Sequence, residues 1–417
     1  MYERILRGPL TEALTDTPVV LVSGARQTGK STLVQSVVQG DYVTFDDVGT
    51  ATAARADPQG FIGSLRRPAI LDEVQLVPEI FRSIKFHVDR DRRPGSFVLT
   101  GSANVMLLPN LSDSLAGRME ILTLWPLSQG ELSGMSEGFI DAAFGSAPPV
   151  LGPSRLSQQE LIARVLEGGF PDVVGRASAR RSRAWFQAYS TTILQRHVRD
   201  ISDIDALGDL PRLLSRVAAQ PMGIANVASL GRSLELPATS LRRYLNLLIA
   251  SYVVQPVAGW SRQLTPRMAK TEKLTLLDSG LIAYLQNVDA DRIRLERTLF
   301  GPLLESFVLM ELRKQLEWAN TLARLFYLRT HSGTEVDIVI ESNDGRVVGI
   351  EVKATASPDQ DDFRGLRFLR DNYGDRFVRG VVLYTGEHSL PFGDRLWAMP
   401  VDALWRWGAV PIPPADV

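Results

Sequence analysis

Short apolar runs alternate with helical stretches between residues 18 and 133 of this 417-residue chain. The runs predict buried strands at 19–23, 42–45, 69–71, 96–100 and 120–124. Because helical stretches lie between the strands, we expect a parallel sheet flanked by helices. Residues 1–135 are therefore predicted to form an α/β domain.

The rest of the chain divides by composition and pattern. Residues 136–160 are rich in Gly, Pro and Ser, which predicts a linker or an insertion. A mostly helical region follows over 161–290, and strand-like alternation returns at 326–328, 336–340, 347–352 and 380–384. We therefore expect a second α/β domain over 291–417.

Residues 211–260 of the helical region predict three short helices and a strand that begins near Tyr252. This order is typical of a winged helix-turn-helix. Arg242 and Arg243 fall near the exposed face of the third helix, the element that reads the major groove in such folds. The same module also serves as a packing or interaction domain, and the sequence leaves both roles open.

A second basic stretch precedes this module. Residues 176–199 hold six arginines, among them Arg180, Arg181 and Arg183, and no acidic residue. Such a face either grips the phosphates of a nucleic acid or is solvated and reaches acidic groups of another domain. We treat these three arginines, with Arg242 and Arg243, as candidate nucleic-acid contacts.

The first predicted strand leads into GARQTGKS, residues 24–31, which fits the phosphate-binding pattern GxxxxGK[ST] at every fixed position. Gly24 and Gly29 let backbone N–H groups turn toward phosphates, and the following helix adds positive potential at its N-terminus. Lys30 is placed to reach the β- and γ-phosphates, and Ser31 to ligate Mg²⁺. The candidate nucleotide-binding residues are Gly24, Ala25, Arg26, Gln27, Thr28, Gly29, Lys30, Ser31 and Thr32.

The third predicted strand ends in two carboxylates, Asp72 and Glu73. The first is placed to hold Mg²⁺ through water or Ser31, and the second to orient and deprotonate an attacking water. With the phosphate loop, they extend the prediction from nucleotide binding to hydrolysis.

Polar residues after the fourth strand and before the fifth are further candidates for contacts with the γ-phosphate. Ser102 and Asn104 are suited to contact that phosphate or its water, with capping of a following helix as the alternative. Arg118 follows a glycine and is suited to pair with a transferring phosphoryl group, with a surface salt bridge as the alternative.

In the C-terminal third, acidic residues and a lysine are spaced as on two hairpin-linked strands. Asp337 lies on the first strand, Glu351 and Lys353 lie on the second, and Glu305 lies in the preceding helical run. Asp337 and Glu351 can converge on one Mg²⁺ or Mn²⁺ ion, with the Val352 carbonyl as a further oxygen ligand. Lys353 shares a strand face with Glu351 and is placed to position or activate water for phosphodiester cleavage, with Glu305 completing the site.

Composition constrains the location and the partners. The formal charge is −1, so any nucleic-acid surface has to be a local patch. Cysteine is absent, which excludes disulfides and thiolate metal sites and fits a reducing cytoplasm. Since the first residues lack a signal-peptide pattern and no apolar run approaches the ~20 residues that span a bilayer, we expect a cytoplasmic protein without a membrane partner.

The N-terminal motifs resemble a bacterial and archaeal family of AAA-superfamily ATPases; the matching segments are 24–31, 71–75, 99–102, 115–118 and 126–128. The resemblance implies that Asp72 and Glu73 are the Mg²⁺ and water-activating pair. It also implies a sensor at Ser102 or Asn104, and a γ-phosphate contact by Arg118 within or between subunits. Such modules often work as rings, so a homo-oligomer is a candidate assembly.

The C-terminal residues resemble the PD-(D/E)xK nuclease superfamily. Asp337 and the run Glu351-Val352-Lys353 carry this resemblance, and Val336 stands where a proline is usual. The larger region from about Gly169 resembles the domain of unknown function that usually follows this ATPase type, on residues 169–171 and 277–281. In the nuclease superfamily the core also persists as a DNA-holding or purely structural module, so cleavage, binding and structure all stay open.

The sequence as a whole predicts an Mg²⁺-dependent ATPase that couples ATP binding and hydrolysis to a C-terminal nuclease-like domain acting on DNA or RNA. One alternative is a nucleic-acid-stimulated translocase or remodelling ATPase whose nuclease-like domain only binds. The other is an ATP-gated protein-interaction switch without nucleic acid.

Overall fold

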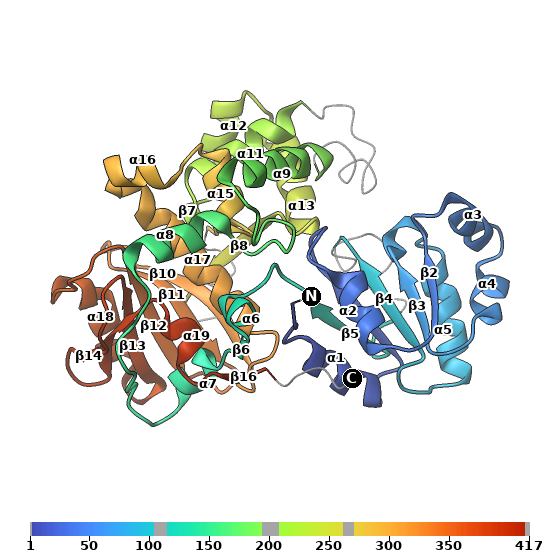
Figure 1. The fold of residues 1–417 in the computed structure, drawn as a ribbon, viewed down its shortest axis with the longest axis horizontal. Coiled ribbons are helices and arrows are strands. Elements are labelled where there is room, and N and C mark those ends of the chain that lie inside the picture. The colour runs from blue at the N-terminus through green and yellow to red at the C-terminus, as the bar shows by residue number, and fades with distance from the viewer. Residues whose placement is uncertain (1, 104–114, 194–207, 262–270, 413–417) are drawn as a thin grey trace.

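The computed structural model describes residues 2–103, 115–193, 208–261 and 271–412. Figure 1 shows two lobes: the N-terminal strands and their helices form one, and nearly all later elements form the other. No helix in these residues has the length and apolar character needed to cross a membrane.

The N-terminal lobe is built on a five-stranded parallel sheet with the order β2-β3-β4-β1-β5. Its strands are β1 (Val19–Ser23), β2 (Asp41–Thr44), β3 (Ala69–Asp72), β4 (Phe97–Gly101) and β5 (Met119–Thr123). Each strand lies within one residue of its predicted range, and the expectation of a parallel α/β sheet is confirmed. Because β4 is inserted between β1 and β3, the carboxyl ends of these three strands are neighbours.

Helices cover both faces of this sheet because alternate strand residues point to opposite sides. Val20 and Val22 pack toward α1 (Arg7–Asp16) and α2 (Lys30–Val37). Val19 and Leu21 belong to the core of the opposite face, which is covered by α3 (Val48–Ala56), α4 (Pro58–Ser64) and α5 (Ile80–Arg90). All five residues of β1 are buried, as expected for a central parallel strand.

The second lobe contains a nine-stranded mixed sheet with the order β14-β15-β13-β12-β11-β10-β8-β9-β7. The strands are β7 (Gly223–Ile224), β8 (Val254–Gly259), β9 (Lys273–Leu276), β10 (Ala323–Arg329), β11 (Glu335–Ser342), β12 (Val347–Lys353), β13 (Phe377–Tyr384), β14 (Leu390–Pro391) and β15 (Leu396–Pro400). Since β7, β8 and β9 come from the region predicted to be helical, the sheet continues across the expected boundary near residue 290.

Helices surround this sheet, and three of them lie where the helices of a winged helix-turn-helix were predicted. These three are α11 (Asp209–Ala219), α12 (Val227–Leu234) and α13 (Ala238–Ala250). The assignment of a winged-helix fold itself stays a prediction. The other helices of this region are α8 (Gln158–Glu167), α9 (Ala179–Thr192), α15 (Ser279–Leu285) and α16 (Ala290–Leu295), and α18 (Arg364–Tyr373) packs on the far face of the sheet.

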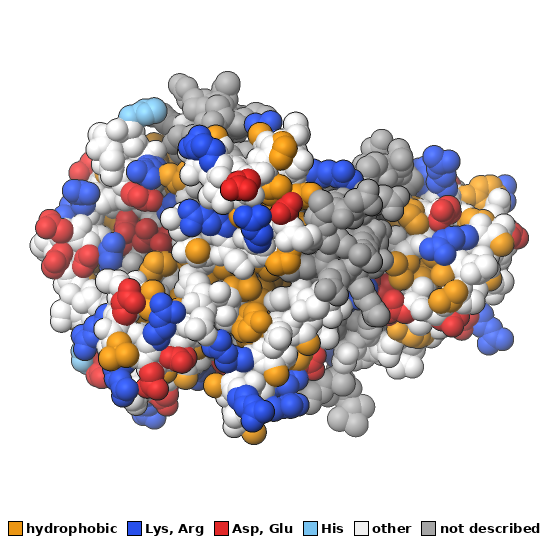
Figure 2. All heavy atoms as spheres, turned by 90° about the horizontal axis from the view of Figure 1, so that it is seen from above, with side chains coloured by type: hydrophobic (Ala, Val, Ile, Leu, Met, Phe, Trp, Pro, Cys, Tyr) orange, Lys and Arg blue, Asp and Glu red, His pale blue; other side chains and the backbone are white. Residues whose placement is uncertain are grey.

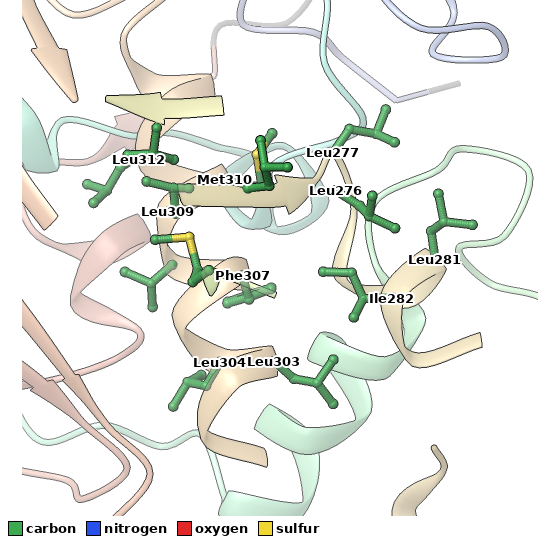
Figure 3. Packing of buried hydrophobic residues seen from close by; sticks show 14 of the residues in the cluster. Leu276, Leu277, Leu281, Ile282, Leu303, Leu304, Phe307, Leu309, Met310 and Leu312 are labelled. Carbon is green, nitrogen blue, oxygen red and sulfur yellow. The ribbon is translucent and has the colours of Figure 1, made fainter. Parts of the chain in front are cut away.

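The helix α17 (Phe300–Gln315) is the centre of the second lobe. Twelve of its 16 residues are buried, so the helix is covered on nearly all sides. Figure 3 shows Leu303, Phe307 and Met310 of this helix near Leu276, Leu277 and the α15 residues Leu281 and Ile282. One hydrophobic core thus joins the middle helices to the C-terminal sheet.

Residues 136–160, expected to be a linker or an insertion, pack on the C-terminal elements. They contain α7 (Phe139–Phe144), and the Phe139 ring meets Trp407 edge-on at 5.5 Å. The Ser154 hydroxyl donates to Asp402 Oδ2 at 2.7 Å. At the start of this segment, β6 (Met135–Ser136) pairs with β16 (Val410–Pro411), beside α6 (Gln129–Ser133) and α19 (Ala403–Arg406).

A buried ion pair of α17 holds the chain that leaves β5. Lys314 Nζ donates to Glu311 Oε1 at 2.6 Å and to the Leu127 carbonyl at 2.9 Å. The backbone N–H of Gln129 donates to Glu311 Oε2 at 2.8 Å. Both charged residues are at most 4% exposed, so each depends on the other for compensation in a medium that solvates charge poorly.

We expect Glu311→Ala to lower the free energy of unfolding by about 3–5 kcal/mol, because it leaves Lys314 buried without its counter-ion. Chemical denaturation followed by circular dichroism measures the loss. Lys85→Ala is the control, since the Lys85–Asp89 pair is 40% and 38% exposed and its removal should cost less than about 1 kcal/mol. Equal losses in the two variants would contradict this role for Glu311.

Candidate functional site

The predicted phosphate loop connects the end of β1 to the start of α2. Gly24 must be a glycine because a Cβ there would lie 2.3 Å from the Leu124 carbonyl oxygen. Gly29 precedes α2 with a φ of +94°, in the left-handed region that favours glycine. The two fixed glycines thus let the loop pass beside β5 and then turn into the helix.

Lys30 lies inside this loop and is 5% exposed. Its ammonium group donates to the carbonyl oxygens of Gly24 at 3.1 Å and Ala25 at 2.9 Å. Burial lowers the pKa of Lys30 to about 8, although the charges of Glu73 and Asp72 oppose this shift. The ammonium group therefore lies close to neutrality at mildly alkaline pH.

Asp72, at the tip of β3, is held by hydroxyl groups from three other elements. Ser31 donates to its Oδ1 at 2.7 Å and Tyr42 to its Oδ2 at 2.8 Å, and Thr100 at the end of β4 also donates to Oδ1. Burial and the hydrogen bond to Asp72 raise the pKa of Tyr42 to about 12. The hydroxyl of Ser31 and the carboxylate of Asp72 are the hard oxygen groups that Mg²⁺ prefers, so this pair fits such an ion.

Glu73 has a backbone conformation that is uncommon for a residue with a side chain. Its φ is +57°, and its N–H donates to Thr100 Oγ1 at 3.2 Å. The Ser102 hydroxyl lies 2.8 and 2.9 Å from the two carboxylate oxygens, and Gln75 also donates to that carboxylate. Ser102, Gln75 and the turn thereby fix the direction of the Glu73 carboxylate.

Strained backbone is concentrated at this edge of the sheet. Three of the seven non-glycine residues with positive φ in the described ranges lie here, namely Gln27, Glu73 and Tyr252. Such conformations cost about 1–3 kcal/mol each and persist where the surroundings fix them, most often at functional sites. Tyr252 comes from the second lobe, and its hydroxyl lies 2.7 Å from Ser23 Oγ at the end of β1.

The remaining nucleotide-site candidates have different outcomes. Ser102 lies beside Glu73, whereas Asn104 falls outside the described residues. Arg118 precedes β5 at the amino-terminal edge of the sheet, where its carbonyl accepts from Val19 N and its side chain pairs with Asp89. Five residues of strand, about 16 Å, separate that edge from the phosphate loop, so the expected contact of Arg118 with a phosphate on its own chain is wrong.

Sequence reasoning missed several residues that hold this site. Thr100 and Tyr42 donate hydrogen bonds to Asp72. Thr100 could have been found from the sequence, because side chains alternate along a strand and Thr100 lies two residues before Ser102. No sequence signal pointed to Arg4, which donates to the Thr28 carbonyl at 2.7 Å and to the Trp125 carbonyl at 2.7 Å. Arg4 thereby ties the phosphate loop to the chain that follows β5.

The predicted C-terminal residues lie where β11, β12 and α17 meet. Phe326 of β10 pairs with Val339 of β11, and Leu328 pairs with Val336. The two paired residues are two positions apart on β10 but three positions apart on β11, so β11 carries one extra residue between Val336 and Val339. This β-bulge surrounds Asp337, whose Oδ2 accepts the backbone N–H of Val352 at 2.9 Å. Bulges recur near active sites because they redirect one side chain.

Two carboxyl groups close to Asp337 hold protons more strongly than usual. Burial, followed by the charge of Asp337, raises the pKa of Glu305 to about 8 and the pKa of Glu351 well above its ordinary value. Lys353 Nζ lies 3.0 Å from Glu351 Oε2. The predicted Glu305, Asp337, Glu351 and Lys353 are thus one electrostatic group.

A lysine that the sequence did not indicate joins this group. Lys273 of β9 lies 3.4 Å from Glu305 and 2.8 Å from Glu335, and it is 4% exposed. Among the described residues, no three His, Cys, Asp or Glu side chains form a cluster suited to a metal ion. Asp337 and Glu351 offer two carboxylates to a divalent cation, so their fit to such an ion is partial.

The five candidate nucleic-acid arginines lie on α9 and α13. Arg180, Arg181, Arg242 and Arg243 are exposed, whereas Arg183 donates to Asn287 and lies 5.9 Å from the centre of the Tyr284 ring. Figure 2 shows basic and acidic side chains interspersed over the described part of the face seen from above. Contact of these arginines with nucleic acid stays a prediction.

The lowered pKa of Lys30 predicts a pH limit for ATP binding. Above about pH 8 the free lysine loses its proton, and the affinity for a non-hydrolysable ATP analogue should then fall up to about tenfold per pH unit. Calorimetric titrations between pH 7 and 10 measure this. Lys30→Ala should bind weakly without that dependence, and an unchanged affinity of the unaltered chain up to pH 9.5 would contradict the role of Lys30.

Three protein families match consecutive parts of the chain. Residues 16–133 match the AAA domain, residues 158–292 match a domain of unknown function (DUF8612), and residues 300–404 match a domain of unknown function (DUF4143). Among solved structures, the chain is similar to a signal-transduction ATPase with a tetratricopeptide repeat sensor from Pyrococcus horikoshii. The two sequences are 10% identical, the similarity covers 75% of this chain and 45% of that chain, and the TM-score is 0.21. It is also similar to McrB hexamers with bound McrC from Thermococcus gammatolerans, with 13% identity, 67% and 73% covered, and a TM-score of 0.21. Neither score indicates a shared overall arrangement.

Two mycobacterial proteins are similar over most of their length. The uncharacterized proteins Rv2008c of Mycobacterium tuberculosis and Mb2031c of Mycobacterium bovis are each 32% identical over 405 residues, which is 96% of this chain and 84% of theirs. The chain therefore belongs to the family of these mycobacterial proteins, and its N-terminal lobe is an AAA ATPase domain.

Proposed function

We propose that this ATPase uses Mg²⁺ and couples ATP binding and hydrolysis to its C-terminal domain, which acts on DNA or RNA. The observation that carries the coupling is the position of α17. This helix presents Glu305 to Asp337 and also holds the chain that leaves the ATPase sheet. A movement of the ATPase lobe or of the C-terminal site therefore has to be accommodated by the buried helix α17.

Within the ATPase lobe, the roles follow from the contacts. Lys30 and the loop N–H groups bind the phosphates, and Glu73 accepts a proton from the attacking water while Ser102 and Gln75 keep its carboxylate in place. Ser31 and Asp72 would hold Mg²⁺, which would supply positive charge for the phosphates. Thr100 and Tyr42 orient Asp72 for that purpose.

Coupling runs through hydrogen bonds between the lobes. The Thr123 N–H donates to Glu317 Oε2 at 3.2 Å and the Trp125 indole donates to Glu317 Oε1 at 3.1 Å, just beyond α17. The Trp125 ring also meets Tyr252 edge-on at 5.7 Å, and Tyr252 contacts Ser23 beside the phosphate loop. The end of β5, the loop and α17 therefore share partners.

At the C-terminal site, cleavage is the first candidate activity. Asp337 and Glu351 would hold a divalent cation, Lys353 would position the water, and Glu305 would adjust the charge. A second candidate, nucleic-acid action without cleavage, is favoured by the two lysines, since Lys273 and Lys353 already neutralise the carboxylates. Arg180, Arg181, Arg183, Arg242 and Arg243 are the proposed contacts with the nucleic acid. A ring in which Arg118 reaches a neighbouring subunit is part of the same proposal.

Replacing Glu73 with glutamine tests the ATPase chemistry. We expect Glu73→Gln to reduce the turnover rate by about 10²–10⁴-fold, because the amide cannot accept the proton, while ATP still binds. Phosphate release and calorimetric binding measure the two quantities. Glu79→Gln, an exposed residue outside the site, is the control; normal turnover in Glu73→Gln would refute the assignment of the base.

Assays on single-stranded DNA, duplex DNA and RNA test the action of the second lobe. We expect nucleic acid to stimulate ATP hydrolysis, and Mg²⁺ or Mn²⁺ to support cutting that Asp337→Ala or Lys353→Ala abolishes. Asp371→Ala, an exposed carboxylate on α18, should cut normally. Stimulation without cutting selects the second candidate, and the absence of both leaves an ATP-gated interaction switch.

A further inference from the structure

A cleft of about 320 Å³ lies between the phosphate loop and α9 of the second lobe. The ATPase side contributes Arg26, Gln27, Asp46 and Glu73, and the helix side includes Trp185, Tyr189 and Thr192. The second lobe therefore forms one wall of a cleft beside the phosphate loop.

The side chain of Tyr189 is buried in this wall, and its hydroxyl group has no hydrogen-bond partner among the described residues. The residue is 4% exposed. Its ring stacks on Trp185 at 4.9 Å and packs against Phe170 at 4.8 Å, which fixes its direction. A buried hydroxyl without a hydrogen-bond partner is unfavourable, so this donor is available for a ligand.

A second donor without a partner among the residues described belongs to Arg26, which also lines the cleft. Arg26 Nε is buried without a hydrogen-bond partner in the described part of the chain, and the positive charge of Arg26 acts on both Lys30 and Tyr189. Burial raises the pKa of Tyr189, so its hydroxyl keeps its proton and remains a donor. The Tyr189 hydroxyl and the Arg26 guanidinium are donors suited to an anionic group, and the carboxylates of Asp46 and Glu73 line the same cleft.

The neighbours of the cleft indicate which part of ATP it receives. The phosphate loop has two flanks, one toward β5 with Arg4 and Trp125, and one toward β3 with Glu73. Glu73, as the proposed base, has to lie beside the attacking water, and that water attacks the γ-phosphate. The flank that contains Tyr189 is then the γ-phosphate flank.

We infer that Tyr189, together with Arg26, binds the γ-phosphate of ATP, so that α9 distinguishes ATP from ADP. The inference rests on the proposed role of Glu73 and extends it to the second lobe. Phe186 of α9 stacks on Tyr284 of α15 at 5.9 Å, and α15 shares a core with α17. Binding of the γ-phosphate would therefore affect the position of α17, the helix that carries Glu305 of the C-terminal site.

Calorimetric titration of the full chain with AMP-PNP and with ADP, both with Mg²⁺, tests this. Tyr189→Phe should weaken AMP-PNP binding by about tenfold or more, the effect of one hydrogen bond to a charged group, and leave ADP binding unchanged. Its thermal stability should stay equal or rise, because the variant removes only an unmet hydroxyl. Arg26→Gln should show the same selectivity, and Tyr373→Phe, on α18 and not in the lining of the cleft, is the matched control with normal binding of both nucleotides.

Two results would overturn the inference. If both nucleotides lose affinity equally, Tyr189 contacts a part of the ligand that they share; if neither changes, Tyr189 contacts no phosphate. Tryptophan fluorescence adds an independent readout, since AMP-PNP but not ADP should change a signal that Trp185→Phe removes. Failure of the unaltered chain to bind AMP-PNP would instead refute the proposed ATPase function.

Discussion

The ammonium group of one buried lysine determines how the two lobes meet. Removing such a charge from water costs several kcal/mol, so Lys314 has to find partners in fixed positions. It finds the carboxylate of Glu311 on its own helix and the carbonyl of Leu127 on the chain that leaves the ATPase sheet. Because Glu311 also accepts from Gln129, the chain that leaves the ATPase sheet cannot shift along α17 without losing its hydrogen bonds to this buried ion pair. The position of the phosphate-loop edge of the sheet relative to the second lobe therefore depends on these hydrogen bonds to α17.

The ATPase edge of the sheet is already arranged for its proposed chemistry. Asp72 is bound by three hydroxyl groups, and Glu73 is directed by a strained turn and by Ser102. A site that is organised before the substrate arrives has little to rearrange during reaction, which is the source of most electrostatic catalysis. The strain at Glu73 is sustained by the apolar strands beneath it. Stability of the sheet and direction of the carboxylate are therefore linked.

The sequence predicted the parts of this molecule that depend on local pattern. The five strands of the first lobe follow from short apolar runs, and the phosphate loop and Asp72 follow from motifs whose spacing is set by the chain itself. Contacts between distant segments had no such signal: the pairing of Lys273 with Glu305 and the hydrogen bond between Tyr252 and Ser23 join residues 32 and 229 positions apart. The Gly- and Pro-rich composition of residues 136–160 predicted a linker or an insertion and gave no signal for the packing of Phe139 against Trp407.

That packing has a consequence for how such chains are assembled from modules. Residues 136–160 precede the middle helices in the sequence, yet α7 and Ser154 belong structurally to the last elements of the chain. A recombination event that replaced the chain up to residue 160 would remove Phe139 from the Trp407 ring and the Ser154 hydroxyl from Asp402. The structural unit that contains the C-terminal elements therefore begins near the end of β5. It includes the residues around Trp125 that contact the ATPase lobe.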